Sequence, residues 1–429
     1  MNHAYLSLRM LLAGLLLVVA ASAAAEDAYD FEVDGIYYKI VENEACVTYK
    51  TYTYYSHTAN YESDYSGDIV IPPAVTYNGT TYPVTRIGDH AFYQRVSVTS
   101  VTIPSSVTEV RWDAFTDCTG LTRVNITDIA AWCNLSCGSN PLRYARHLYL
   151  NGTEVTDLVI PESVTVIRNE AFGQCDGLTS VTVGNSVTAI GNNAFEDCGG
   201  LKSVTIGNSV TQIGEVAFDG CTSLTNVRLG DAVQYIQNSA FSGCASLKSI
   251  EIPNSVVALG SRAFQDCTAL TSVSLGNSVA TIGGAAFRRC EALTGIEIPN
   301  SVTEIGGSAF DGCSSLESVT IGSAVTAIGK DAFINAASIA AVTCKAATPP
   351  QWYDLSMFMA NVYNHAPLHV PANAERAYKA REGWGQFITI VGDADDPSVD
   401  PDYTKCDVNG DGEVNIADVN TVIDAIFSR

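Results

Sequence analysis

Hydrophobic and polar positions follow a fixed 23-residue period through most of the chain. Apolar residues two positions apart, with polar residues between them, predict a short strand that buries one face. A Gly or Pro then ends that strand, a second extended piece follows, and a short helical turn is expected to carry an Ala-Phe pair. The apolar positions of one such unit are Leu201, Val204, Ile206, Val210, Ile213, Phe218 and Cys221.

Ten of these units can be counted from their Ala-Phe pairs. Roughly seven buried apolar groups in a unit contribute on the order of 10–20 kcal/mol. Ordering the backbone costs about 1–2 kcal/mol for each residue of the unit, so one unit cannot fold alone. Stacked coils cover one another's apolar faces, and the pattern therefore predicts a β-rich solenoid with a strand ladder along one side. The Phe positions are Phe92, Phe115, Phe172, Phe195, Phe218, Phe241, Phe264, Phe287, Phe310 and Phe333.

Eight cysteines occupy one slot of the repeat, three residues after the Phe. Equivalent positions in adjacent coils lie about 4.8 Å apart. Parallel side chains would keep the Cβ atoms at that separation too, which is slightly beyond the usual disulfide range. We therefore expect a ladder of small buried hydrophobes with reduced thiols, and disulfides between neighbouring coils are the alternative. The ladder positions are Cys118, Cys175, Cys198, Cys221, Cys244, Cys267, Cys290 and Cys313.

The first 25 residues have the composition of a secretory signal peptide. Arg9 precedes an apolar run, Met10–Ala20, and small residues at Ala23–Ala25 offer a cleavage site before Glu26. The apolar run is far shorter than the ~20 residues that a membrane span needs. We expect an exported protein, secreted or at the cell surface, whose mature form has no transmembrane span.

The chain carries a net charge of −23 and has a pI near 4.5. Nucleic acids and anionic membrane surfaces attract proteins through basic patches, so this charge argues against both as partners. Histidines lie in no metal motif or triad context, and no hydrolase, P-loop or dinucleotide-binding fingerprint is present. Composition and motifs therefore favour an interaction protein over an enzyme.

The repeat resembles the BspA-like class of bacterial leucine-rich repeats, over about residues 87–345. Asp30–Ile40 and Tyr82–Phe92 are similar to the N-terminal caps of such proteins. The resemblance implies a leucine-rich-repeat solenoid in a cell-surface protein that binds host matrix proteins or other bacteria. Phe115 and Phe172 are 57 residues apart, against 46 for two units. A degenerate or looped unit is expected at about 116–160, with a tight hairpin turn at Asn151-Gly152.

The ends of the array have their own compositions. Residues 29–93 hold twelve of the twenty tyrosines, for which we expect packing in a β cap, with an aromatic platform for sugar or peptide as the alternative. The predicted divisions are a signal peptide (1–25), an N-terminal β cap (26–80), the repeat array (81–345), a C-terminal cap (346–391), an acidic linker (392–404) and a calcium-loop segment with a short helix (405–429).

The last segment has oxygen-bearing side chains at the spacing of an EF-hand loop. It resembles a dockerin repeat, the calcium module that docks onto cohesin domains, but only one repeat of the usual two is present. One Ca²⁺ is therefore the expected cofactor, and a cohesin-like domain is a further partner that the resemblance implies. The ligand positions are Asp407, Asn409, Asp411, Glu413 (through its backbone carbonyl), Asn415 and Asp418.

Polar residues project outward from the first strand of each unit and form the expected binding face, for a protein or glycan ligand on a host or bacterial surface. The alternative is a non-catalytic component of a cohesin–dockerin-type polysaccharide-degrading assembly. Glu251 and Glu297 lie roughly 10 Å apart by strand spacing, which is near the separation of an inverting glycosidase pair. A flat exposed ladder would offer them neither pocket nor burial, so catalysis is not expected. The binding-face residues are Thr182, Thr205, Arg228, Glu251, Ser274, Glu297 and Thr320.

Overall fold

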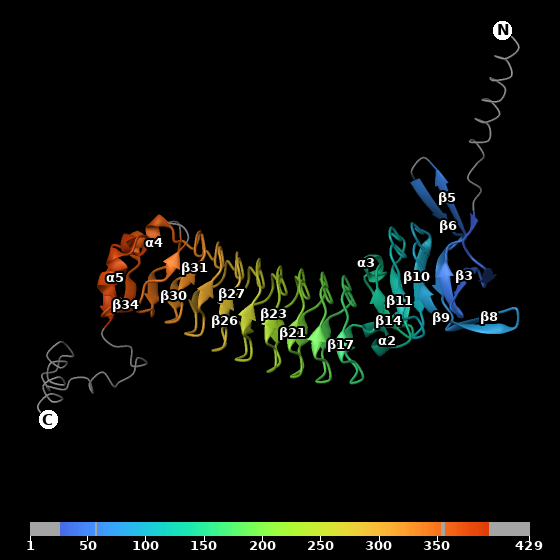
Figure 1. The fold of residues 1–429 in the computed structure, drawn as a ribbon, viewed down its shortest axis with the longest axis horizontal. Coiled ribbons are helices and arrows are strands. Elements are labelled where there is room, and N and C mark those ends of the chain that lie inside the picture. The colour runs from blue at the N-terminus through green and yellow to red at the C-terminus, as the bar shows by residue number, and fades with distance from the viewer. Residues whose placement is uncertain (1–25, 56–57, 353–356, 394–429) are drawn as a thin grey trace, which may run out of the picture.

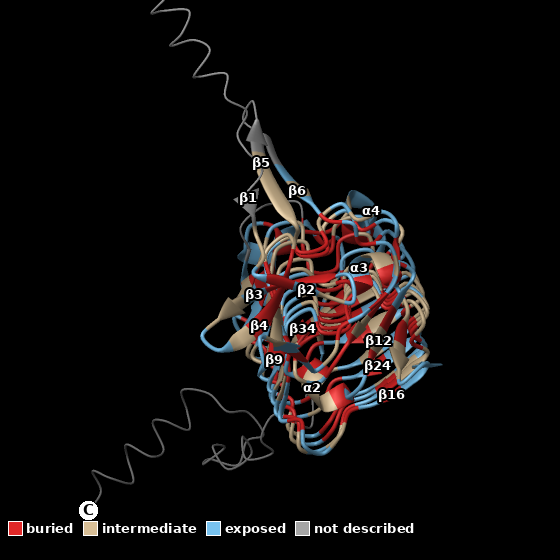
Figure 2. Cartoon of the chain, turned by 90° about the vertical axis from the view of Figure 1, so that its right-hand side faces the viewer, coloured by how far each residue is buried: buried red, intermediate tan, exposed pale blue. Residues whose placement is uncertain are grey.

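Each repeat closes one coil, and the coils stack into an elongated solenoid (Figure 1). The computed structural model describes residues 26–55, 58–352 and 357–393. The predicted signal peptide, nearly all of the linker and the predicted calcium segment lie outside these described residues. Seen end-on, buried residues line the inside of the coils, while exposed residues follow their outer edges (Figure 2).

The first strands of the coils form parallel pairs along one face, which we call the first ladder (Figure 1). Their central Val or Ile points inward and their flanking residues point outward, as the alternating pattern predicts. The strands are β16 (Asp157–Val159), β18 (Ser180–Thr182), β20 (Ser203–Thr205), β22 (Asn226–Arg228), β24 (Ser249–Glu251), β26 (Ser272–Ser274), β28 (Gly295–Glu297), β30 (Ser318–Ile321), β32 (Ala341–Cys344), β34 (Leu368–Pro371) and β35 (Ile390–Asp393).

The second extended pieces pair into a continuous nine-stranded parallel sheet, the second ladder. Each of its strands is two residues long. The second residue is Ile or Leu in all strands but the last, and that side chain is buried. The strands are β17 (Val166–Ile167), β19 (Ala189–Ile190), β21 (Gln212–Ile213), β23 (Tyr235–Ile236), β25 (Ala258–Leu259), β27 (Thr281–Ile282), β29 (Glu304–Ile305), β31 (Ala327–Ile328) and β33 (Gln351–Trp352).

The segment that carries the Ala-Phe pair is a run of hydrogen-bonded turns, where the sequence suggested a short helical turn. Its amide groups bond alternately within the coil and to the next coil. The amide of Ala217 donates to the carbonyl of Gly214 at 3.3 Å, whereas the amide of Phe218 donates to the carbonyl of Ala240 at 2.8 Å. Val216 has a φ of 60°, so the backbone leaves the helical region just before the Phe. These bonds tie adjacent coils together through their turn segments.

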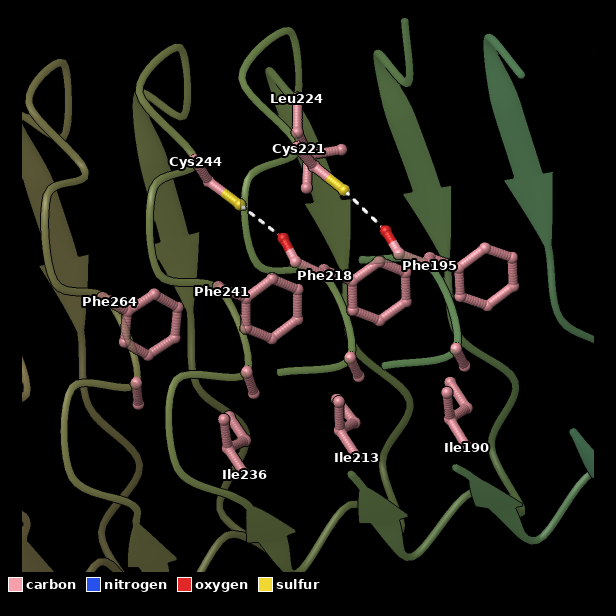
Figure 3. Packing of buried hydrophobic residues seen from close by; sticks show 14 of the residues in the cluster. Ile190, Phe195, Ile213, Phe218, Cys221, Leu224, Ile236, Phe241, Cys244 and Phe264 are labelled. Atoms are coloured by element: carbon pink, nitrogen blue, oxygen red, sulfur yellow. Dashed lines mark hydrogen bonds between the residues drawn. The ribbon is translucent and has the colours of Figure 1, made fainter. Parts of the chain in front are cut away.

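The Phe side chains form a continuous internal stack (Figure 3). From Phe172 to Phe333, successive ring centroids lie 5.1–5.5 Å apart and neighbouring planes differ by 2–10°. Phe358, from the predicted C-terminal cap, extends the stack at 5.2 Å from Phe333. All of these rings are buried, so the stack forms the central part of the core.

The ladder cysteines are fully buried and unpaired, and their thiols link adjacent coils. The Sγ atom of Cys221 donates to the carbonyl of Phe195 at 3.2 Å, and Cys244 donates to Phe218 at 3.3 Å (Figure 3). Burial away from water raises the pKa of these thiols, and that of Cys267 rises to about 12. The cysteines therefore act as small core residues with a weak donor.

Between Phe115 and Phe172 the coil keeps a first-ladder strand but replaces its turns with two short helices. These helices are α2 (Ile129–Cys133) and α3 (Leu142–Ala145). Trp132 fills the core there, and its indole N–H donates to the carbonyl of Ala171 at 2.7 Å. The predicted hairpin at Asn151-Gly152 is confirmed, because Tyr149 pairs with Glu154 and both turn residues have positive φ.

The N-terminal cap joins the solenoid through parallel strand pairs, because β9 (Thr80–Ile87) pairs with β11 (Glu109–Val110) and β7 (Gly67–Val70) pairs with β10 (Val98–Ile103). Its tyrosines Tyr37, Tyr38 and Tyr65 are buried, which agrees with cap packing. One sheet contains β7 (Gly67–Val70), β10 (Val98–Ile103), β12 (Arg123–Ile126), β14 (Leu148–Leu150) and β15 (Thr153–Glu154). The others contain β1 (Glu26–Asp27), β2 (Phe31–Val33), β3 (Ile36–Val41), β4 (Glu44–Thr48), β5 (Thr51–Tyr55), β6 (Thr58–Glu62), β8 (Ala74–Tyr77), β9 (Thr80–Ile87), β11 (Glu109–Val110) and β13 (Ser136–Cys137).

Arg95 occupies the cysteine slot of the first coil and attaches that coil to the N-terminal cap. Its guanidinium donates to the carbonyls of Ser63 at 2.8 Å, Tyr61 at 3.0 Å and Tyr93 at 2.9 Å. At the other end, the cap contains α4 (Ala360–His365), α5 (Glu375–Ala380) and the 3-10 helix η1 (Trp384–Gln386). Within the described residues, no helix has the length and apolar character needed to cross a membrane.

Candidate binding face

The predicted binding-face residues form one column on the first ladder. Thr182, Thr205 and Arg228 are direct register partners on β18, β20 and β22. The pairs Glu251–Ser274 and Glu297–Thr320 continue the column. All seven are exposed except Thr320, which is half-buried. The structure therefore gathers these side chains on one surface, in three registered groups.

The groups are separate because the first ladder is interrupted twice. Strand pairing stops between β22 and β24, which we call joint A, and between β26 and β28, which we call joint B. Val227 and Val273, the central residues of the strands before the joints, are half-buried. The equivalent Val204 and Val319 are buried. Each joint therefore leaves one valine side chain partly exposed between two coils, while the second ladder stays continuous behind it.

A column of asparagines in the turn after the first-ladder strand is interrupted at the same two places. Elsewhere, the side-chain oxygen of each Asn accepts from the backbone amide of the equivalent residue in the next coil, at 2.7–3.3 Å. No such bond crosses joint A or joint B within the described part of the chain. The bonded pairs are Asn185–Asn208, Asn208–Asp231, Asn254–Asn277 and Asn300–Ser323.

The two joints share a sequence signal that we did not use in predicting the face. The coil before each joint ends its strand with Leu, at Leu229 and Leu275, where the neighbouring repeats have Ile or Val. The coil after each joint reads Ile-Glu-Ile-Pro, at Ile250–Pro253 and Ile296–Pro299. Leu lacks the β-branch that favours strand packing, which weakens pairing at these positions. The opening therefore recurs with a period of two repeats.

Joint B forms a shallow depression of about 500 Å³. The expectation of a flat face without a pocket is therefore wrong at joint B, where the unpaired strands β26 and β28 border the depression. The Glu297 carboxylate lies 3.7 Å from the Lys345 ammonium at the edge of the depression. The depression is lined by Val273, Ser274, Leu275, Asn277, Glu297, Ile298, Pro299, Asn300, Ser301 and Lys345.

The chemistry of this face suits binding more than catalysis. Glu251 is exposed, and the Glu297 side chain is 77% exposed, so neither carboxyl has the burial that a general acid uses to hold its proton. The exposed residues of the column are hydroxyls, carboxylates and one guanidinium, which can donate to or accept from a partner. Together with the partly exposed Val227 and Val273, they give a mixture of polar and apolar groups of the kind found at protein interfaces.

Similarity to known proteins agrees with this architecture. Residues 79–137, 145–268 and 234–348 match the family described as "BspA type Leucine rich repeat region", in six copies. A leucine-rich repeat protein from Bacteroides ovatus is 26% identical, with a TM-score of 0.52, and the match covers 85% of this chain and 82% of that one. No curated protein sequence shows significant similarity to this chain.

Two further solved structures are also similar. A leucine rich cell surface protein from Faecalibacterium prausnitzii is 28% identical, with a TM-score of 0.45, over 74% of this chain and 95% of that one. The pneumococcal vaccine antigen PcpA is 15% identical, with a TM-score of 0.43, over 87% of this chain and all of that one. The family match spans more than half of the residues here and coincides with the solenoid coils. This chain belongs to the BspA-type leucine-rich repeat family.

Proposed function

We propose that this protein is a secreted or cell-surface adhesion module that binds a protein partner through its first ladder. The observation that carries the proposal is the depression at joint B, which lies within the exposed polar column. Solenoids of this family are typical of protein interaction, and the scaffold is of a kind that is generally non-catalytic. Export through residues 1–25 would place this face outside the cell.

The size of the face supports the same proposal. Eleven first-ladder strands run from β16 to β35. At a strand spacing of about 4.8 Å they span about 48 Å. A stable protein interface covers about 800 Å² on each partner, which a face of this length can supply. Because adjacent coils hold one another rigidly, little ordering of the ladder would accompany binding.

Substitution on the first ladder should reduce adhesion more than the same substitution on the second ladder. The variant Thr205→Arg/Ser274→Arg places two large charged side chains on the proposed face. We expect binding to immobilised host matrix proteins and to bacterial cells to weaken by about tenfold or more, because interface contacts depend on close fit. Surface plasmon resonance on the purified chain gives the measurement.

The matched control is Thr281→Arg/Gln351→Arg, which introduces the same number of arginines at exposed polar positions of the second ladder. It should bind like the native chain. Equal loss in both variants, with both folded, would assign adhesion to something other than the first ladder. Unchanged binding in the first-ladder variant would contradict the proposal directly.

We further propose that residues 405–429 bind one Ca²⁺. The support is sequence spacing alone: Asp407, Asp411 and Asp418 place three carboxylates within one loop, where they would repel one another without a cation. Docking onto a cohesin-like domain, as in a polysaccharide-degrading assembly, would depend on this loop. It is the second candidate function.

Calcium titration of the full chain, followed by calorimetry, tests the loop. We expect a dissociation constant in the range of about 10⁻⁴–10⁻³ M, as for other extracellular modules. Asp407→Ala should abolish the heat of binding, whereas Asp402→Ala, five residues before the loop, should retain it. An identical titration curve for Asp407→Ala and the native chain would contradict the proposed calcium site.

A further inference from the structure

We propose that joints A and B are paired subsites for a cationic peptide segment in the polyproline II conformation, with Lys or Arg at every third position. This inference rests on the proposed function and specifies the chemistry of the partner that the first ladder recognises. It follows from the equivalence of the two joints, their spacing, and the groups that line them.

Two groups recur at both joints. At each, the coil before the joint contributes a half-buried valine, Val227 or Val273. The coil after it contributes an exposed carboxylate, Glu251 or Glu297, at the outward position of its strand. The chain thus repeats a partly exposed valine beside a negative charge, two coils apart. A ligand that uses both joints must repeat the complementary groups at the same interval.

The interval selects the conformation of the ligand. Along the second ladder, whose strands stay paired behind both joints, two coils correspond to about 9.6 Å. A polyproline II helix advances about 9.3 Å in three residues and returns to the same face, so residues i and i+3 meet the two joints. An extended strand places residues on one face at about 6.6 or 13 Å, neither of which matches. Residues seven apart in an α-helix lie about 10.5 Å apart on one face. The backbone groups of a helix are already hydrogen-bonded to one another, so they cannot bond to the joints.

Polar groups at joint B favour the polyproline form over the helix. The backbone of a polyproline II segment makes no internal hydrogen bonds, so its carbonyls remain free to accept. Ser274, Asn277 and Asn300 line the depression with hydroxyl and amide groups. The side-chain oxygen of Asn300 already accepts from the amide of Ser323 at 2.9 Å, which turns its NH₂ group to other partners. Proline rings would cover Leu275 and Pro299, two of the apolar residues of the lining.

Charge selects the side chains of the ligand. The Glu297 carboxylate lies 3.7 Å from the Lys345 ammonium, and the Glu297 side chain remains 77% exposed. A ligand ammonium or guanidinium can therefore approach the free side of the carboxylate. The net charge of −23 adds long-range attraction for a cationic segment. Both effects should weaken as salt increases.

Synthetic peptides test the inference on the full chain. The probe is a nine-residue peptide of three Pro-Pro-Lys repeats, compared with one that has Lys at every fourth position and with a helical Ala-based peptide that has Lys seven residues apart. We expect the first peptide to bind most tightly by calorimetry. Glu251→Gln and Glu297→Gln should each weaken it by about two- to fivefold, the range of an exposed ion pair, and the double variant by about tenfold. Glu304→Gln, an exposed carboxylate on the second ladder, should have no effect.

The outcomes separate this inference from the proposed function. Equal affinity for all three peptides, tighter binding of the helical peptide, or no loss in the double Gln variant would each overturn the polyproline assignment. Adhesion by the native chain without peptide binding would also overturn it, and would leave the first ladder as the adhesive face. Peptide binding that depends on Glu251 and Glu297, together with adhesion unaffected by Thr205→Arg/Ser274→Arg, would instead contradict the proposed function.

Discussion

Raising the pH from 8 to 10 under reducing conditions is expected to destabilise the solenoid by on the order of 10 kcal/mol. The twelve cysteines of the described residues all have raised pKa values because burial disfavours the thiolate. In the unfolded chain these thiols titrate near their ordinary value of about 8.5. Each therefore contributes about 1 kcal/mol or more of lost stability by pH 10.

The sign follows from which state binds more protons. Below the unfolded pKa both states hold their thiol protons, and the stabilising contribution is fully present. Above it, the unfolded chain releases protons that the folded chain retains, so stability falls as the pH rises toward about 12, the folded pKa of Cys175 and Cys267. Denaturant unfolding at fixed steps from pH 7 to 10.5, followed by circular dichroism, measures the slope.

Tyrosine and lysine also titrate in this range, so cysteine-to-alanine variants supply the control. Cys221→Ala/Cys244→Ala removes two of the twelve described thiols and should reduce the thiol-dependent loss by about a sixth. A pH dependence that is unchanged in this variant would assign the alkaline loss to other groups. Neighbouring ladder cysteines found in disulfides would contradict the premise itself.

Phe241→Ala is expected to destabilise the array by about 3–5 kcal/mol, because it removes a fully buried ring from the stack. The ring lies 5.2 Å from Phe218 and 5.5 Å from Phe264, and neither neighbour can fill the space without leaving its own position in the stack. Because each coil contacts mainly its neighbours, the damage should stay local. Hydrogen exchange followed by mass spectrometry should show lost protection in the adjacent coils first.

Tyr235→Ala provides the comparison within the same coil. That aromatic side chain is 45% exposed on the second ladder, so its removal should cost much less than the loss of Phe241. Equal losses for the two variants would mean that the stack does not carry the core. Loss of protection along the whole array in Phe241→Ala would contradict nearest-neighbour stacking.

The periodic features could be predicted from the sequence because every coil repeats the same local interactions. The 23-residue spacing alone predicted that the coils stack and that the side chains of Phe241 and Cys221 are buried between them. The Asn151-Gly152 hairpin was also predictable, since its turn chemistry is local. In each case the residues that decide the structure lie within one unit or in its exact repeat in the next.

The departures from the repeat depended on contacts between different segments. Arg95 stands in a cysteine slot, but only the fold brings the carbonyls of Tyr61 and Ser63 to its guanidinium. Phe358 lies outside any Ala-Phe unit, yet it extends the ring stack from the C-terminal cap. No local pattern specifies these partners. The carbonyls that bind Arg95 are 32 and 34 residues away in the chain, and Phe358 lies in a segment without the repeat motif.

The binding face shows the same division between sequence and tertiary structure. Alternation along each strand determined that Thr205, Glu251 and Glu297 point outward, because successive side chains of a strand face opposite sides. Whether adjacent coils pair along that face is decided by how closely neighbouring backbones approach, which depends on the packing of both coils together. The substitution of Leu at Leu229 and Leu275 is small in sequence, but it accompanies the two open joints and the depression. Sequence thus determined the direction of each side chain, and tertiary packing decided where the ladder opens.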